Sequence, residues 1–343
     1  MSKVINVSDD SGSNWYPIPG PDGSFSVDGD QIDDSVLGQT YKSSQTGLAT
    51  WAVNARGYYK GFAGYNADLK KDGTPVATTG EAMSLVSGKT YRIDDTAKEV
   101  WDPDLTITVY DNASPVAAVD IESFNYLFGQ VTFTSGYTVI GAITIDVTYF
   151  PLATFGKARS FTLTQSSDPL DTSDYQTVQA NTGFRTHAAG LRTVDLELSG
   201  IFNATDDWAG ELINRNVILI EINADGNQKS TARGWFQIVT TNQEGDVGDN
   251  ETETVSFSLN VQDQDQDPFA WDHASDTTLA TSIQKILTAF EAQTDLDVQY
   301  LYDGTNGVTG VTVVTESTLS SDIEGMNEFS FTFTGDGATT AVP

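Results

Sequence analysis

The sequence YKSSQTGLATWAVNARGYY, Tyr41–Tyr59, decides the fold, because a matching stretch, FRTHAAGLRTVDLELSGIF, follows as Phe184–Phe202. In both, an aromatic residue, a cation and a small hydroxyl residue lead to Gly-Leu-x-Thr. A run of strand length then ends at a glycine with an aromatic residue close behind it. All matching positions share one offset, so an internal duplication explains the pattern better than chance does. The repeat is too long for a solenoid unit, and the sequence therefore predicts two similar domains in one chain.

The second half of each stretch alternates between two faces, as a β-strand buried on one side does. In Val194–Leu198 the alternation is strict, with apolar residues on one face and Asp195 and Glu197 on the other. Further alternating runs are separated by Gly, Asn and Pro turns. They are Leu105–Tyr110, Gly129–Phe133, Ile143–Tyr149, Ala158–Thr164, Val217–Ile222, Ala232–Val239, Thr254–Val261, Val311–Thr315 and Phe329–Phe333. The pattern predicts a mainly β chain of antiparallel sandwiches or barrels.

One stretch has the apolar spacing of an amphipathic helix, and it covers about residues 277–291. Asp276 or Thr277 is suited to cap its start. The apolar stripe consists of Leu279, Ile283, Ile286, Leu287 and Phe290. Shorter helices are expected over Glu81–Val86 and Thr205–Arg215.

The predicted domains are an N-terminal arm over residues 1–30, a first β domain over 31–165, and a second over 166–343 with the helix and the C-terminal strands. Trp15 and Tyr16 are large aromatic residues in a segment that two prolines keep extended. A free tail seldom carries such side chains, so we expect the arm to dock, either on its own chain or on a neighbour.

The charge of the chain limits its partners. Lys and Arg number 17 against 48 Asp and Glu, which gives a formal net charge of −31. Such a surface repels phosphate, so the chain is not expected to hold DNA, RNA or an anionic membrane. Two explanations stay open: the acidity serves solubility or adaptation to salt, or the surface is selected not to adhere to a polyanion.

Few residues offer catalytic or metal chemistry. The chain has no cysteine, and His187 and His273 are its histidines. For His187 a surface or interface position explains the residue better than a catalytic one. Asp263–Asp267 has the opening spacing of a calcium loop, but Pro268 and Ala274 stand where that loop requires Gly and Glu. With so many acids, a carboxylate pair is no specific signal, so no enzyme activity, cofactor or metal is predicted.

The first residues, Met1–Ile5, do not open an apolar segment of signal length, and no apolar run is long enough to span a bilayer. We therefore expect a protein that is made and kept soluble in a cytoplasm. A β-rich, duplicated chain with an aromatic arm and no evident site has the features of a building block.

Several motifs resemble the major tail tube proteins of long-tailed bacteriophages. The resemblance is clearest over residues 170–343 and looser over 31–165, where the repeat, Val109–Asn112 and Gly129–Phe133 carry it. The motifs of the second half are Gly190–Gly200, Ala232–Phe236, Gly245–Gly248, Glu253–Leu259 and Phe329–Gly337.

The resemblance implies sandwiches that join edge to edge into stacked rings with six tube domains each. The genome passes through the lumen on ejection, and a negative wall would let it slide without binding. It also implies a virion tail location after assembly in the host cytoplasm, with tape measure and tail terminator proteins as partners. Two tube domains per chain favour a ring of three chains with pseudo-sixfold symmetry; six chains is the alternative if the first half is a decoration domain.

Candidate functional residues follow from this interpretation. Asp195 and Glu197 are candidates for the lumen, although the same face would also suit an ordinary outer surface. The acidic loop would line the lumen or contact the next ring, through Glu244, Asp246, Asp249 and Glu251. The candidates for contacts between subunits are Trp15, Tyr16, Lys42, Arg185 and Arg192. Pairing within one chain would explain these residues equally well.

A second function class fits the composition. Aromatic residues and carboxylates on a β-sandwich also suit a carbohydrate-binding or receptor-binding protein of the tail fibre or lectin type. A third class, an acidic surface-layer or adhesin module, is disfavoured by the missing secretion signal.

Overall fold

The computed structural model describes residues 3–20, 22–35, 42–63, 67–154, 158–203, 206–224, 231–245, 251–260, 267–273 and 279–343. The prediction of a mainly β chain with antiparallel sheets is confirmed, and each alternating run named above overlaps a strand. The chain forms two compact units. Unit 1 comprises Met1–Asn66, Arg159–Leu198 and His273–Pro343, and unit 2 comprises Ala67–Ala158 and Ser199–Asp272.

These units do not coincide with the predicted domains 31–165 and 166–343, because each unit draws segments from both. The strands pair with partners far away along the chain, and β24, for example, is paired with both β23 and β4. Sequence proximity is therefore a poor guide to which strands share a core.

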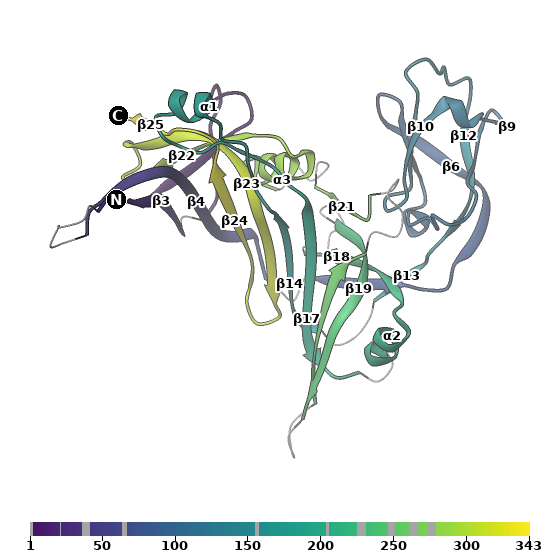
Figure 1. Ribbon diagram of the computed structural model, residues 1–343. Coiled ribbons are helices and arrows are strands. Elements are labelled where there is room, and N and C mark those ends of the chain that lie inside the picture. Colours follow the sequence, from purple (N-terminus) through teal and green to yellow (C-terminus); the bar gives the residue numbers. More distant parts are fainter. Residues whose placement is uncertain are drawn as a thin grey trace. The chain divides into compact units, whose positions relative to one another are not determined.

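Unit 1 is built on an antiparallel sheet in the order β17-β14-β23-β24-β4-β3, and β23 also pairs with β25 and with β22, which leads to β1 and β2 (Figure 1). The strands are β1 (Val4–Ser8), β2 (Tyr16–Pro17), β3 (Asp22–Asp33), β4 (Ser44–Ala63), β14 (Ala158–Ser167), β17 (Arg192–Ile201), β22 (Leu296–Leu301), β23 (Gly307–Asp322), β24 (Met326–Gly335) and β25 (Thr340–Val342). A small pair of strands, β15 (Leu170–Asp171) and β16 (His187–Ala188), flanks helix α1 (Tyr175–Ala180).

The core of unit 1 lies between one face of this sheet and helix α3 (Thr281–Ala292), which packs against β1, β2 and β23. Trp51 is almost fully buried there, and its indole nitrogen donates to the carbonyl of Gly337 at 2.8 Å. A Cβ atom at Gly335 would lie 2.2 Å from this ring, which explains why that strand position is glycine.

Helix α3 begins later than the predicted residue 277. Its N-cap is Ala280, which makes no side-chain capping bond, and the proposed caps Asp276 and Thr277 lie outside the described residues. The predicted apolar stripe is correct, since Ile283, Ile286, Leu287 and Phe290 are all buried.

Unit 2 contains two sheets. The first has the order β13-β5-β18-β19-β20, with β21 also paired to β19, and the second has the order β10-β11-β7-β6-β12-β8-β9. The first sheet comprises β5 (Asp68–Asp72), β13 (Leu152–Thr154), β18 (Val217–Asn223), β19 (Thr231–Glu244), β20 (Thr252–Leu259) and β21 (Phe269–Asp272), with helix α2 (Trp208–Asn214). The second comprises β6 (Val76–Ser87), β7 (Thr90–Ile93), β8 (Thr108–Asp111), β9 (Ser114–Pro115), β10 (Ile121–Asn125), β11 (Gln130–Phe133) and β12 (Ile143–Tyr149), with 3₁₀ turns η2 (Thr96–Lys98) and η3 (Ala118–Asp120).

The two short helices expected from the sequence have opposite outcomes. Thr205–Arg215 contains α2, as predicted. Glu81–Val86 does not form a helix but lies within β6, because pairing with β12 on one side and β7 on the other overrides a weak local preference.

Buried charges join the two sheets of unit 2. Arg233 on β19 donates to Glu99 at 2.7 Å and to the carbonyl of Leu127 at 2.7 Å, and lies 2.6 Å from Glu221 on β18. The side chains of Arg233, Glu99 and Glu221 are 8%, 3% and 3% exposed. The network continues from Glu99 to Arg92 at 2.9 Å and from Glu221 to Lys70 at 2.8 Å.

Burial disfavours the charged form of Glu221, but the attraction of Arg233 and Lys70 outweighs it and lowers the pKa of this carboxyl. Arg233 also lies over the ring of Phe128, with the guanidinium carbon 4.7 Å from the ring centre. The charges of the network are thus compensated by direct partners, which a buried charge requires.

The same order of elements occurs once in each unit. Unit 2 has α2-β18-β19-β20 and unit 1 has α3-β22-β23-β24, and in both the long hairpin shifts register, between Ile238 and Thr240 and between Val314 and Glu316. The repeated stretches fall on β4, the partner of β24, and on β17. The Ser199–Ile201 end of β17 belongs to unit 2 and neighbours β20. Tyr41 of the first copy lies outside the described residues.

Candidate functional site

The sheet of unit 1 has a polar face opposite its core. Register places residues of neighbouring strands side by side on it: Thr164 faces Thr318, Thr318 faces Ser330, Ser330 faces Arg56, and Arg56 faces Asp22. We call this surface the polar face. It consists of Thr193, Asp195 and Glu197 on β17; Ser160, Thr162, Thr164 and Ser166 on β14; Glu316, Thr318, Ser320 and Asp322 on β23; Glu328, Ser330, Thr332 and Thr334 on β24; Ala52, Asn54, Arg56 and Tyr58 on β4; and Asp22, Ser24, Ser26 and Asp28 on β3.

Hydroxyl and carboxyl side chains make up almost all of the polar face. Arg56 is the cation among the residues just named, and it is neutralised by Glu328, whose carboxylate lies 2.7 Å away. The hydrogen bond from Arg56 to Glu328 raises the pKa of the guanidinium further. The polar face therefore presents short, hydrated side chains and a net negative charge.

The two lumen candidates belong to this face. Asp195 and Glu197 are exposed, while Val194, Leu196 and Leu198 between and beside them are buried, as the alternation predicted. Thr193 on the same side lies 2.7 Å from Ser166 of β14, oxygen to oxygen, which places both hydroxyls on this face. Whether this face lines a lumen stays a prediction.

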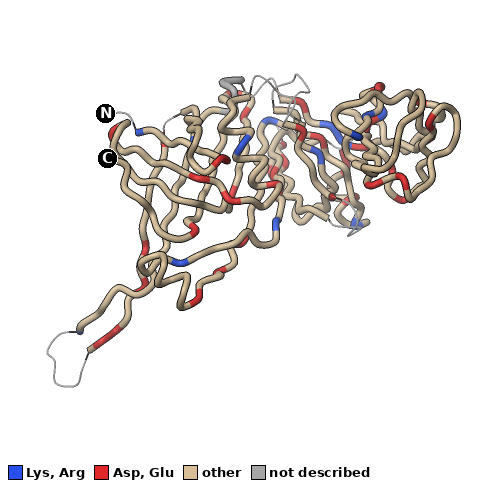
Figure 2. Tube along the Cα trace, turned by 90° about the horizontal axis from the view of Figure 1, so that it is seen from above, with Lys and Arg blue, Asp and Glu red and all other residues tan. Residues whose placement is uncertain are grey.

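The acidic character extends over the described chain. Figure 2 shows Asp and Glu segments outnumbering Lys and Arg segments along the trace. Of the acidic loop, Glu244 ends β19 and is exposed, and Glu251 is exposed just before β20. Asp246 and Asp249 lie outside the described residues.

Three of the candidates for contacts between subunits make contacts within unit 1. The Tyr16 ring lies 4.7 Å from the ammonium of Lys285. Arg185 forms ion pairs with Asp30, at 2.6 Å, and with Asp171. Arg192 donates to the backbone carbonyl of Glu291 at 3.0 Å.

Two other candidates are less constrained. Trp15 lies beside Gly12, where an added Cβ would be 3.2 Å from its ring. Lys42 is exposed and forms no ion pair with another residue in the part of the chain that the structure describes. The N-terminal arm is thus docked on its own unit through β2. A role between subunits for the five candidate residues stays a prediction.

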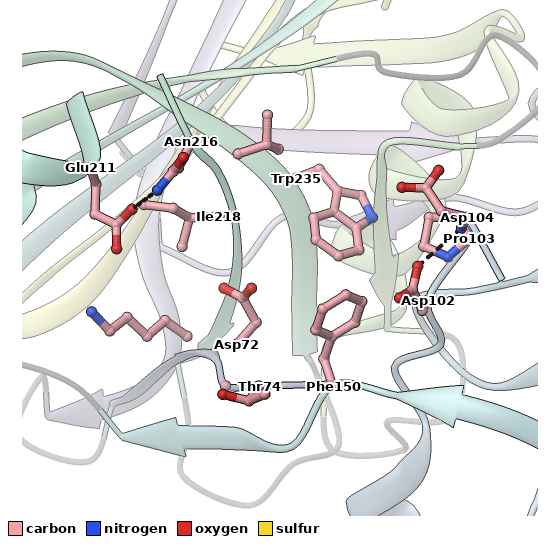
Figure 3. Close-up of a pocket in the computed structure, with 13 residues that line it drawn as sticks. Asp72, Thr74, Asp102, Pro103, Asp104, Phe150, Glu211, Asn216, Ile218 and Trp235 are labelled. Carbon is pink, nitrogen blue, oxygen red and sulfur yellow. Dashed lines mark hydrogen bonds between the residues drawn. The ribbon is translucent and has the colours of Figure 1, made fainter. Parts of the chain in front are cut away.

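A second candidate site is a pocket of about 550 Å³ in unit 2 (Figure 3). Trp235 and Phe150 form one wall, with ring centres 5.4 Å apart at an interplanar angle of 75°. Lys71, the cation that lines the pocket, donates a hydrogen bond from its Nζ atom to the carbonyl oxygen of Asp206 at 3.2 Å. Four carboxylates also line the pocket: Asp72, Asp102, Asp104 and Glu211.

Asp72 is the most perturbed group of the pocket. Burial raises its pKa to about 6, against the hydrogen bond that its carboxylate accepts from the Leu219 amide at 3.0 Å. Figure 3 shows its carboxyl pointing into the space between Ile218 and Trp235. An anionic pocket with an aromatic wall has the chemistry to bind a sugar or an organic cation.

Replacing Asp72 with asparagine should change how stability depends on pH. Because the folded pKa is raised, the proton on Asp72 stabilises the fold below about pH 4, and this contribution is lost as pH rises through 6. We expect the free energy of unfolding of wild type, relative to Asp72→Asn, to fall by on the order of 2 kcal/mol between pH 4 and pH 7. Urea unfolding across this range measures it, and Asp104→Asn, an exposed carboxylate of the same pocket, is the control. A difference independent of pH would contradict the assignment.

Sequence reasoning did not find the pocket, because its lining comes from several separate segments and its acids have no distinctive spacing. In the sequence, Trp235 is conspicuous only as part of the motif Ala232–Phe236. The polar face was detectable in part, since Phe329–Phe333 already alternates phenylalanine with hydroxyl residues.

Both histidines make contacts within unit 1. His187 lies with its Nδ1 atom 2.8 Å from the carbonyl oxygen of Gly335. The buried His273 lies 3.3 Å from Glu291. Within the described ranges no group of three or more His, Asp or Glu has the arrangement of a metal site. In that same part of the chain no helix combines the length and apolar character needed to cross a bilayer.

No protein-family model and no curated protein matches the chain. It is similar to a chain from the virion of a native gene transfer agent particle, at 11% identity and a TM-score of 0.30, over 35% of this chain and 88% of that one. It is also similar to a chain from the tail of an empty gene transfer agent particle with C6 symmetry, at 16% identity and a TM-score of 0.29, over 32% of this chain and 83% of that one.

Proposed function

We propose that this chain is a structural virion protein that polymerises as stacked rings into a phage tail tube, whose negatively charged lumen conducts the DNA genome. The observation that carries the proposal is the polar face. B-DNA carries one negative charge per roughly 1.7 Å of its axis, so a wall of carboxylates repels it throughout its passage. Short serine and threonine side chains keep that wall smooth and hydrated.

The open edge of β3 supports assembly by sheet extension. β3 is long and, among the described strands, pairs only with β4. An edge of this kind presents unpaired amide and carbonyl groups, and addition of a second copy would satisfy them. In a closed ring every such edge is paired.

The recurring order of elements supports two tube domains per chain, and so a ring of three chains with pseudo-sixfold symmetry. In this role the protein is not an enzyme, holds no cofactor, and resides in the tail after assembly in the host cytoplasm. Its partners are further copies of itself and the proteins that fill and terminate the tube.

Negative-stain electron microscopy of the purified protein, with end-on averaging, tests the proposal. Hollow rings or tubes are expected, and threefold averages would favour three chains over six. A compact monomer at high concentration under all salt conditions would count against a tube.

The pocket favours one other function, carbohydrate or receptor binding. A saccharide could stack on Trp235 while carboxylates such as Asp72 and Asp102 accept hydrogen bonds from its hydroxyls. A glycan array with wild type and Trp235→Ala separates the two proposals. If the protein forms no rings, and if Trp235→Ala loses a glycan binding that wild type shows, the result would select carbohydrate or receptor binding over the tail tube.

A further inference from the structure

The pocket of unit 2 shown in Figure 3 carries more negative charge than its surroundings compensate. Lys71 is the cation among its lining residues, and the Nζ atom is already engaged with the Asp206 carbonyl at 3.2 Å and lies 4.8 Å from the centre of the Trp208 ring. Burial raises the pKa of Asp72 to about 6, and the opposing effect of the Lys71 charge is too small to prevent this. The pocket therefore attracts positive ligands and repels anions.

The carboxylates of the pocket form two pairs on opposite sides of its aromatic wall. Asp72 and Glu211 are the first pair. Burial is the largest cause of the raised pKa of Asp72 and the negative charge of Glu211 adds to it, which indicates that these two groups lie near each other. Asp102 and Asp104 are the second pair, joined by a hydrogen bond from the Asp104 amide to the Asp102 carboxylate at 3.0 Å. In Figure 3 the two aromatic rings lie between the first pair and the second.

The hydrogen bonds of the first pair orient its carboxylates but leave their charge in place. Asp72 accepts from the backbone amide of Leu219 at 3.0 Å, and Glu211 accepts from the side-chain amide of Asn216 at 2.6 Å. Both donors are neutral, as is the backbone amide that binds the second pair. A cation at either pair would therefore form hydrogen bonds of the stronger, charge-assisted kind.

The size and lining of the pocket narrow the class of ligand. Its volume of about 550 Å³ lies in the range of small-molecule sites and is far larger than a metal ion needs. Among the described residues no group has the arrangement of a metal site. A sugar would cover the rings but bring no charge to the carboxylates. A ligand with a cation at each end and an apolar middle would satisfy the pairs and the rings together.

We propose that this pocket binds a linear diamine or polyamine, with one ammonium group at each pair of carboxylates and the methylene chain across the rings of Trp235 and Phe150. The methylene groups gain from burial against the rings. The bound ligand would also offset part of a formal net charge of −31, whose self-repulsion opposes a compact fold. The inference needs no second copy of the chain, so it does not depend on the proposed ring.

Ligands of matched size test whether both ends are bound. Putrescine and spermidine carry an ammonium group at each end, whereas butylamine has the carbon chain of putrescine with a single ammonium group. Isothermal titration calorimetry of wild type, at roughly 0.15 M salt to screen non-specific attraction, measures the affinities. The tighter polyamine should bind at least about tenfold more strongly than butylamine. Equal affinities, or no binding of either polyamine, would overturn the inference.

Two double variants with the same change in net charge test where the polyamine binds. Asp102→Asn with Asp104→Asn neutralises the second pair and keeps an acceptor oxygen at residue 102, so polyamine affinity should fall at least about tenfold. Asp94→Asn with Glu122→Gln alters exposed positions of unit 2 outside the pocket and should change it less than about threefold. Equal losses in both variants would mean attraction to the acidic chain as a whole, which contradicts a site in the pocket.

The remaining outcomes separate this inference from the other proposals. Circular dichroism shows whether each variant is folded, and the comparison of ligands on wild type stands even where a variant does not fold. A glycan that binds the pocket when neither polyamine does would overturn the inference in favour of carbohydrate binding. Because the titration does not require assembly, its failure would leave the tube proposal intact, and absence of rings would leave the polyamine site intact.

Discussion

Replacing Arg233 with methionine should destabilise unit 2 by about 3–5 kcal/mol, the usual cost of removing one partner from a buried ion pair. Methionine preserves much of the apolar stem and removes the charge. Glu99 and Glu221 would then stay in a nearly water-free place, each with one cation left, Arg92 and Lys70 respectively. The carbonyl of Leu127 would also lose its donor.

Arg56→Met is the matched control. Its partner Glu328 is equally close, but the side chains are 65% and 35% exposed, so the loss should be below about 1 kcal/mol. The free energy of unfolding is measured by denaturant titration, with tryptophan fluorescence as the signal. Unit 2 contains four tryptophans that report on it, Trp101, Trp208, Trp235 and Trp271. A cost for Arg233→Met no larger than that for Arg56→Met would show that the network does not hold the two sheets together.

The network should also make unit 2 sensitive to acid. The pKa of Glu221 is lowered in the fold, so its contribution is present above the unfolded pKa and is lost as pH falls through the folded value. The difference in free energy of unfolding between wild type and Arg233→Met should accordingly become smaller in acid.

The second large effect is expected on the polar face. The triple variant Asp195→Lys, Glu197→Lys and Glu316→Lys reverses three charges on β17 and β23, the two strands that flank β14. Assembled wild type should not retain DNA even at low salt. The variant should bind it at least about 1,000-fold more tightly at 50 mM salt than at 200 mM, because each phosphate contact releases counterions.

A second triple variant tests whether the position of the new lysines matters, because it makes the same change in net charge on unit 2. Asp94→Lys, Asp104→Lys and Glu122→Lys lie at exposed places of unit 2. Fluorescence anisotropy with a labelled duplex, at several salt concentrations, compares the two variants after assembly. Equal DNA binding by both, or tight binding by wild type, would contradict a lumen lined by the polar face.

The sequence predicted the local structure well where a period was strong. Phe329–Phe333 and Val194–Leu198 alternate over enough residues to specify both a strand and its buried side. The stripe from Ile283 to Phe290 specified α3 in the same way. Glu81–Val86 has no such period, and its strand conformation depends on partners that are distant in sequence.

The candidate site was predictable in part. Asp195 and Glu197 were found because acids that alternate with buried leucines are conspicuous. The hydroxyl residues that complete the polar face, such as Thr164 and Thr318, became meaningful only when the register placed them together. The repeat signalled two copies but not which distant strands complete each one, so the compact units differ from the predicted ranges 31–165 and 166–343.

The discontinuity of unit 1 sets an order of folding during synthesis. All segments of unit 2 precede β22, whereas the sheet of unit 1 lacks β23 and β24 until the ribosome has passed residue 335. Unit 2 should therefore fold while unit 1 is still incomplete. Neighbouring nascent chains on one messenger RNA would then not assemble with one another, because the sheet that carries the polar face is not yet formed. Proteolysis of ribosome-bound chains arrested before β22 would check this timing: unit 2 should resist cleavage and β4 should not.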